Sequence, residues 1–200
     1  NGSNILVDKD SFSIYDESLI RTRFNLYFDN DPCYRLKSIK NKIEIKNTKK
    51  IHLYDGLAMT KFLYYLKNKK LRFDEIKLEK KLEELRKRNK AYLFPSFNTI
   101  SGSGPNSAII HYKASKISNR KIKRNDIYLC DSGGQYNYGT TDVTRTICFS
   151  KQSLKIKNIF TRVLKGHIAV SSFKLRENSS GSNIDYGARK YLKQIGLNYS

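Results

Sequence analysis

Apolar side chains recur every three or four residues between Leu36 and Leu66, which is the spacing of a buried helix face. The positions in this stripe are Leu36, Ile39, Ile43, Tyr54, Ala58, Phe62 and Leu66. A polar interruption near Asn47 and Thr48 predicts a break between two helices, with Thr48 as the cap of the second. Another apolar stripe, flanked by Glu–Lys and Glu–Arg pairs four residues apart, predicts a third helix over Phe73–Arg88.

Runs of β-branched and aromatic residues predict strands at several places. These runs are Ile5–Asp8, Tyr92–Phe94, Ala108–Tyr112, Ile127–Cys130 and Val143–Phe149, and Ser101–Pro105 between them is predicted to be a loop. Helices are expected again over Ser153–Phe173 and Ser182–Ile195, with Gly196 as a C-terminal cap. The run Asp29–Pro32 is interpreted as a domain junction, because Asn and Asp favour turns and a residue before proline avoids the helical region.

The 200 residues include 39 Lys and Arg against 18 Asp and Glu, a formal charge of +21. Such an excess raises nucleic acid or another acidic partner as a hypothesis. The basic residues are scattered along the whole chain, however, and form neither one block nor an aromatic–basic RNA-binding motif. Solvated helix faces are therefore the favoured interpretation, and nucleic acid is the minority one.

No apolar run approaches the roughly 20 residues that a membrane span needs, so no membrane partner is expected. The first residues lack the charged-then-apolar order of a signal peptide and an initiating Met, and the chain is expected to begin inside a longer one. Cys33, Cys130 and Cys148 are an odd number without a Cys-x-x-Cys pair, which favours reduced thiols and a cytoplasmic location.

Two aspartates lie on either side of a glycine-rich segment between two of the predicted strands. If the hairpin is symmetric about Tyr136 and Asn137, Asp131 and Asp142 are directly opposed, with Cβ atoms about 4.5–5.5 Å apart. Two like charges there destabilise a sheet unless solvent, a shared proton or bound cations compensate them. The spacing alone favours ordinary Asp–Gly turn chemistry over a metal site, so the pattern by itself does not establish one.

The two segments around these aspartates, Asp131–Tyr136 and Gly139–Thr146, closely resemble the first two metal-ligand segments of the aminopeptidase P family. Other segments resemble the same family in the same order, so that the similarity runs from about residue 32 to the end of the chain. They are Lys40–Ile45, Asp55–Ala58, Phe94–Asn106, Ile109–Tyr112, Leu164–Val170 and Gly196–Tyr199.

By this resemblance the fold is the pita-bread α/β (α+β) fold, of which the chain would hold only the N-terminal portion. Residues 1–35 would be the tail of a preceding creatinase-type domain, and residues 36–200 the N-terminal part of the catalytic domain, incomplete at its C-terminus. The resemblance implies removal of the first residue from peptides that have proline in the second position. It also implies a homodimer, formed partly through regions outside this chain.

The same resemblance implies that Asp131 and Asp142 are ligands of two divalent metal ions, typically Mn²⁺, and that His111 is a catalytic residue that contacts the substrate. Two such ions activate water as a nucleophile at neutral pH and polarise the scissile carbonyl. Hard carboxylate oxygens suit Mn²⁺. A histidine beside the ions can donate to the developing oxyanion or assist proton transfer.

The family completes its metal site with one histidine and two glutamates, which are expected after residue 200. Residues 1–200 alone are therefore expected to be inactive and to bind metal weakly, with a longer parent or a partner chain holding the remainder. The alternatives are a prolidase-like dipeptidase, a methionine aminopeptidase, or a catalytically dead pita-bread protein that binds a partner as histone chaperones do. The Ser101–Asn106 loop and the close match over Asp131–Arg145 favour aminopeptidase P over the other two enzymes. The retention of Asp131, Asp142 and His111 argues against a catalytically dead protein.

Overall fold

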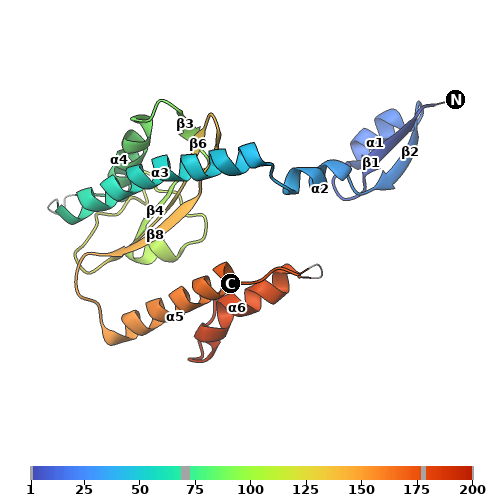
Figure 1. The fold of residues 1–200 in the computed structure, drawn as a ribbon. Coiled ribbons are helices and arrows are strands. Elements are labelled where there is room, and N and C mark those ends of the chain that lie inside the picture. The colour runs from blue at the N-terminus through green and yellow to red at the C-terminus, as the bar shows by residue number, and fades with distance from the viewer. Residues whose placement is uncertain (1, 69–72, 177–178, 200) are drawn as a thin grey trace.

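The computed structural model describes residues 2–68, 73–176 and 179–199. At the N-terminal end, two parallel strands and the helix between them form a small unit, which Figure 1 shows apart from the rest of the chain. Its elements are β1 (Asn4–Asp8), α1 (Ile14–Ile20) and β2 (Asn25–Asp29). The strand predicted near the N-terminus is confirmed. The predicted junction at Asp29–Pro32 coincides with the end of β2 and the start of α2 (Pro32–Ser38), which leads to the main body.

The long helix α3 (Lys42–Asn68) begins where two side chains close its first turn. The Asn41 side chain accepts hydrogen bonds from the backbone of residues 43 and 44, and the Glu44 carboxylate accepts one from the Asn41 N–H. The predicted break near Asn47 and Thr48 is wrong. This reciprocal capping box already starts the helix upstream, and both residues lie inside it.

The helix α4 (Glu75–Lys87) is confirmed at the predicted position, and its N-cap Asp74 accepts a hydrogen bond from the Lys77 N–H at 2.9 Å. Burial raises the pKa of Asp74, but hydrogen bonds from Lys77 and Asn119 outweigh it, so that the pKa lies below its ordinary value. Both predicted surface ion pairs form, Glu83–Lys87 at 2.8 Å and Glu84–Arg88 at 3.0 Å.

Two antiparallel sheets follow, one with the order β3-β6-β7 and the other with the order β4-β5-β8. Their strands are β3 (Tyr92–Pro95), β4 (Ile100–Ser103), β5 (Ile127–Ser132), β6 (Gly134–Tyr136), β7 (Gly139–Thr140) and β8 (Val143–Cys148). The predicted strands at residues 92–94, 127–130 and 143–149 are confirmed. Because β5 and β6 lie in different sheets, the glycine-rich segment between β5 and β8 links the two sheets.

Two predictions between β3 and β5 are wrong. The predicted loop Ser101–Pro105 begins as the strand β4, which pairs with β5. Gly102 in this strand lets the backbone of Asn106 and Ser107 approach closely. The predicted strand Ala108–Tyr112 is instead the end of a 3₁₀ helix, η1 (Gly104–Ala108), followed by a turn. Its two isoleucines are exposed, and its backbone hydrogen bonds are local ones. The residues therefore pair with no other strand despite their high β propensity.

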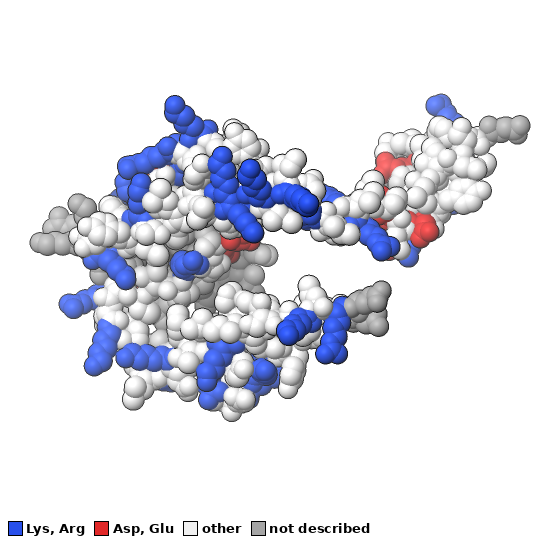
Figure 2. All heavy atoms as spheres, in the orientation of Figure 1, with Lys and Arg blue, Asp and Glu red and all other residues white. Residues whose placement is uncertain are grey.

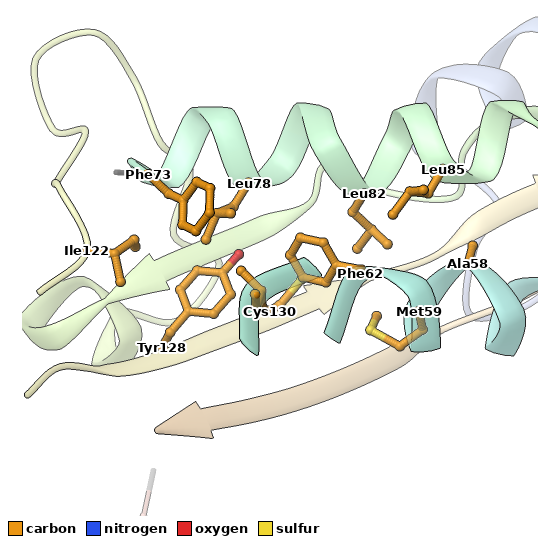
Figure 3. Packing of buried hydrophobic residues seen from close by; sticks show 11 residues of the cluster. Ala58, Met59, Phe62, Phe73, Leu78, Leu82, Leu85, Ile122, Tyr128 and Cys130 are labelled. Carbon is orange, nitrogen blue, oxygen red and sulfur yellow. The ribbon is translucent and has the colours of Figure 1, made fainter. Parts of the chain in front are cut away.

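The hydrophobic core lies between α3, α4 and the sheet β4-β5-β8 (Figure 3). Phe62 of α3 and Leu78 and Leu82 of α4 have no exposed surface, and Tyr128 and Cys130 of β5 meet them from the sheet. Burying one such aliphatic or aromatic side chain contributes about 1.5–3 kcal/mol. This core fixes β5, and with it the hairpin that carries the two aspartates.

The chain ends in an antiparallel pair of helices, α5 (Leu154–Ser171) and α6 (Gly181–Lys193), which Figure 1 shows below the main body. Both were predicted. Gly196 has φ +70° and ends α6, with its own N–H and the next one bonded to the last carbonyls of the helix. Figure 2 shows Lys and Arg scattered over this face of the molecule, as the sequence predicted. None of the helices among the described residues is long and apolar enough to cross a membrane.

Candidate metal centre

The two aspartates lie on the two arms of the hairpin, as predicted, but with a different register. Asp131 is in β5 and pairs with Thr144 of β8, whereas Asp142 lies two residues earlier, just before β8. The hairpin is therefore centred between residues 137 and 138, and the predicted direct pairing of Asp131 with Asp142 is wrong. The two residues are diagonal neighbours on the same face of the sheet.

The carboxyl groups of these aspartates still come within hydrogen-bonding reach of each other. Burial, followed by the negative charge of Asp131, raises the pKa of Asp142 above its ordinary value. Asp131 is half-buried and Asp142 is exposed, so an ion can reach both from solvent. Thr144 donates a hydrogen bond of 2.8 Å to one carboxylate oxygen of Asp131, which orients that side chain.

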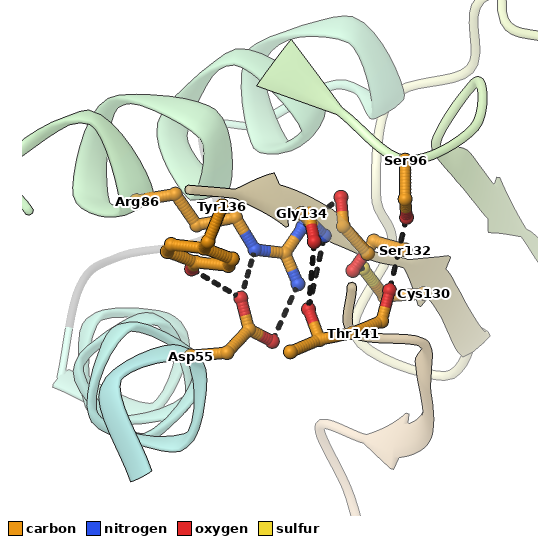
Figure 4. Close-up of polar contacts among 9 residues, drawn as sticks. Asp55, Arg86, Ser96, Cys130, Ser132, Gly134, Tyr136 and Thr141 are labelled. Atoms are coloured by element: carbon orange, nitrogen blue, oxygen red, sulfur yellow. Dashed lines mark hydrogen bonds and ion pairs between the residues drawn. The ribbon is translucent and has the colours of Figure 1, made fainter. Parts of the chain in front are cut away.

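The loop between the strands is clamped so tightly that only glycine fits at position 133. A Cβ there would lie 2.0 Å from the Thr141 carbonyl oxygen and 2.2 Å from the Ser96 hydroxyl. The Ser96 hydroxyl donates to that carbonyl at 2.9 Å, and the Gly134 N–H donates to the Thr141 hydroxyl at 3.0 Å (Figure 4). These contacts fix the backbone immediately before Asp142.

A buried ion pair also holds this loop in place (Figure 4). Arg86 of α4 binds Asp55 of α3 through two hydrogen bonds of 2.7 and 3.0 Å, and both side chains are almost fully buried. The Tyr136 hydroxyl donates to Asp55 at 2.7 Å, and Arg86 also donates to the Gly133 carbonyl at 3.4 Å. Burial and the hydrogen bond to Asp55 raise the pKa of Tyr136, so the hydroxyl stays protonated.

This ion pair was not predicted from the sequence, although a signal was present. Asp55 follows the buried Ile51 by four residues, and Arg86 follows the buried Leu82 by four residues. Each of two neighbouring helices thus carries a charged residue on its apolar face. Because buried charges are almost always paired, this pattern indicates that the two side chains form an ion pair in the core.

His111 lies in the turn after η1 and is exposed, with φ +54°. It lines a groove of about 290 Å³ together with Asp131, Ile100 and Leu129. The structure thus places the predicted substrate-contacting histidine and one predicted metal ligand in the same groove. Within residues 2–68, 73–176 and 179–199, no group of three or more His, Cys, Asp or Glu side chains is placed to hold a metal ion.

Residues 46–200 match the model of metallopeptidase family M24. The chain belongs to this family. This M24 chain is 43% identical over 167 residues to a protein named "Probable Xaa-Pro aminopeptidase P" from Podospora anserina, covering 82% of this chain and 25% of that protein. A protein of the same name from Paracoccidioides lutzii is 41% identical over 172 residues, with 84% and 28% covered. The chain spans about a quarter of the length of the curated relatives it matches.

Solved structures confirm the predicted pita-bread fold for this M24 chain. X-prolyl aminopeptidase from Caenorhabditis elegans, a cytosolic enzyme with a di-nuclear active site, superposes with a TM-score of 0.82 at 35% identity, covering 88% of this chain and 29% of that one. A prolidase from Thermococcus sibiricus superposes with a TM-score of 0.78 at 28% identity, covering 98% and 52%.

Proposed function

We propose that this protein is a metal-dependent aminopeptidase that hydrolyses the bond between a first residue and a proline in second position. The observation that supports it most is the groove that holds both His111 and Asp131, next to Asp142, in an M24 chain. The relatives named Xaa-Pro aminopeptidase P supply the substrate class.

Asp131 and Asp142 fit the part of a two-metal site that carboxylates supply. Their oxygens are hard donors on one sheet face, close enough for one charge to raise the pKa of the other group, and a divalent cation would relieve that repulsion. We propose two such ions, most simply Mn²⁺. Bound divalent ions lower the pKa of water and polarise a carbonyl. One histidine and two glutamates beyond residue 200, in a longer or partner chain, would complete the ligands, so residues 1–200 alone are proposed to be inactive.

The side chains of this chain would then do three things. The Asp131 carboxylate, held by Thr144, would hold a metal ion at the groove that it lines. His111 contacts the peptide beside the scissile bond and donates a hydrogen bond to, or moves a proton at, the carbonyl oxygen. Ile100 and Leu129 line the same groove and offer apolar surface to the substrate. We further propose a cytoplasmic homodimer that acts on peptides and binds neither membrane nor nucleic acid.

The experiment compares cleavage of Xaa-Pro-Xaa and Xaa-Ala-Xaa peptides by the full-length protein, with Mn²⁺ and after chelation. Asp142→Asn is the test variant, and Asp185→Asn, an exposed carboxylate on α6, is the matched control. We expect metal-dependent release of the first residue from the proline peptide only, lost in Asp142→Asn and kept in the control. Equal cleavage of both peptides would reject the proline specificity, and no cleavage by a folded, metal-loaded protein would reject the enzyme. An Xaa-Pro dipeptide is assayed beside these peptides, and cleavage confined to it would indicate a prolidase instead.

A further inference from the structure

A buried carboxylate outside the metal centre lies at the base of the segment that carries His111. Glu75, the first residue of α4, has no exposed surface. None of the ion pairs found among the described residues involves it, so its charge is balanced by hydrogen-bond donors and by the positive end of the helix. Its donors are the Ser103 N–H at 2.8 Å, the Asn106 amide at 3.0 Å, the Tyr112 hydroxyl at 2.7 Å and the Arg120 N–H at 2.9 Å.

Three of these donors bracket one segment of the chain. Ser103 is its first residue, Asn106 lies within it, and Tyr112 directly follows His111. The Asn106 amide also lies 2.8 Å from the Tyr112 hydroxyl, so the two donors support each other. The carboxylate of Glu75 therefore ties the beginning, the middle and the end of the segment to the same point on α4.

Side-chain contacts give the segment its shape: besides those with Glu75, the Asn106 amide and the Tyr112 hydroxyl lie 3.1 and 3.0 Å from the Ser118 carbonyl oxygen. The backbone of the segment makes no strand pairing after Ser103, and it turns through two left-handed residues, Gly104 at φ +56° and His111 at φ +54°. Apart from glycine, His111 is the one residue with a positive φ in the part of the chain that the structure describes. A left-handed conformation costs a non-glycine residue about 1–3 kcal/mol and persists only where the surroundings enforce it.

We propose that Glu75 is a positioning residue, which holds the His111 ring at the groove it shares with Asp131 through the hydrogen bonds from Ser103, Asn106 and Tyr112. The inference rests on the proposed role of His111 in peptide cleavage. The residue must be a carboxylate, because both oxygens accept hydrogen bonds. Glutamine has the same shape but places an NH₂ group against donors, which leaves at least one of them buried and unpaired.

The first test is a double-mutant cycle on the Mn²⁺-loaded full-length protein with an Xaa-Pro-Xaa peptide. Glu75→Gln, His111→Ala and the double variant are compared, with Glu84→Gln, an exposed carboxylate on the same helix, as the control. Because a displacement of about 1 Å at a catalytic group can cost 100-fold, we expect Glu75→Gln to lower kcat about 10–100-fold with little change in KM. The double variant should be no slower than His111→Ala alone. Losses that multiply would overturn the inference, because Glu75 would then act independently of His111.

The second test does not depend on catalysis. Hydrogen exchange of Glu75→Gln, followed by mass spectrometry, should be faster in peptides covering residues 104–112 and unchanged in those covering residues 131–146. Unchanged exchange at residues 104–112, or faster exchange throughout, would overturn the inference. If the wild-type protein cleaves no Xaa-Pro peptide, the proposed function fails, and this measurement still decides whether Glu75 holds the segment. Tyr112→Phe, which removes one donor and leaves the others, should give a smaller increase in the same peptides.

Discussion

The buried pair Asp55–Arg86 offers the sharpest test of how the structure is held together. In Arg86→Met, a side chain of similar length replaces the guanidinium group, and the Asp55 carboxylate keeps only the Tyr136 hydroxyl as a partner. The exposed fraction of Asp55 is 3%, so water cannot take the place of the lost donors. The Gly133 carbonyl loses its contact with Arg86 as well.

The expected loss follows from this burial. Breaking a buried ion pair by removing one partner costs about 3–5 kcal/mol, because an uncompensated charge stays behind. For a chain of this size, each kcal/mol lowers Tm by about 2–4 °C, so the expected shift is about 6–20 °C. Arg88→Met is the matched control on the same helix. Arg88 is exposed and pairs with Glu84 at the surface, where such a pair contributes about 1 kcal/mol at most.

Thermal unfolding is followed by far-UV circular dichroism, because these 200 residues contain no Trp whose fluorescence could report it. The reasoning would be refuted if Arg86→Met lowered Tm no more than Arg88→Met does. Replacing both partners, as in Asp55→Leu with Arg86→Met, should recover part of the loss, because no buried charge remains. A double variant less stable than Arg86→Met alone would show that the pair is not the source of the cost.

Three further predictions concern single contacts. Thr144→Val removes the hydrogen bond that orients a proposed ligand and should weaken Mn²⁺ activation of the full-length protein about 10–100-fold; an unchanged titration would contradict it. Gly133→Ala drives a Cβ against the Thr141 carbonyl and should destabilise by about 1–3 kcal/mol or more in urea unfolding, whereas Gly56→Ala, which meets nothing within 4 Å, should not. Asp74→Ala should cost about 0.5–2 kcal/mol at pH 7. Because the pKa of Asp74 is lowered by folding, this difference should disappear as the pH falls below about 3.9, and a difference independent of pH would argue against the cap.

The helices and strands could be predicted where a local pattern and its end signals agree. The helices α5 and α6 combine apolar spacing with a serine before the first turn, and Gly196 ends the second. The start of α3 was missed although Asn41 and Glu44 form a recognisable capping box. The polar residues further on attracted the prediction, but polar residues inside a long helix cost little when a strong cap precedes them.

The segment around His111 could not be predicted, because no local pattern describes it. Its apolar residues have the composition of a strand, but its backbone hydrogen bonds are local ones, from Ile109 to Asn106 and from Tyr112 to Ile109. Its actual shape depends on Glu75, which lies on α4 and meets the segment only after the chain has folded. A buried glutamate with several backbone donors leaves no sequence signature of its own.

The predicted hairpin register was wrong because the sequence pattern cannot distinguish registers that differ by two residues. Moving the partner of Asp131 from position 142 to position 144 shifts the pairing by two residues, and such a shift leaves every side chain on the same face. The alternation of residues that fixes the face of a strand therefore cannot distinguish the two registers. The tight contact of Gly133 with Thr141 decides between the two registers. As diagonal neighbours on one face, the two residues are still close enough for the charge of Asp131 to act on the Asp142 carboxyl group.

Four carboxylates of the main body are of two kinds. Asp55 and Glu75 are buried carboxylates, and each is fully compensated, the first by a guanidinium group and the second by four donors. Asp131 and Asp142 are accessible, they repel each other, and neither takes part in an ion pair among the described residues. In a chain with a formal charge of +21, a cationic side chain to neutralise them was readily available. Leaving this one pair without such a partner costs stability, and a bound divalent cation is the partner that would recover it.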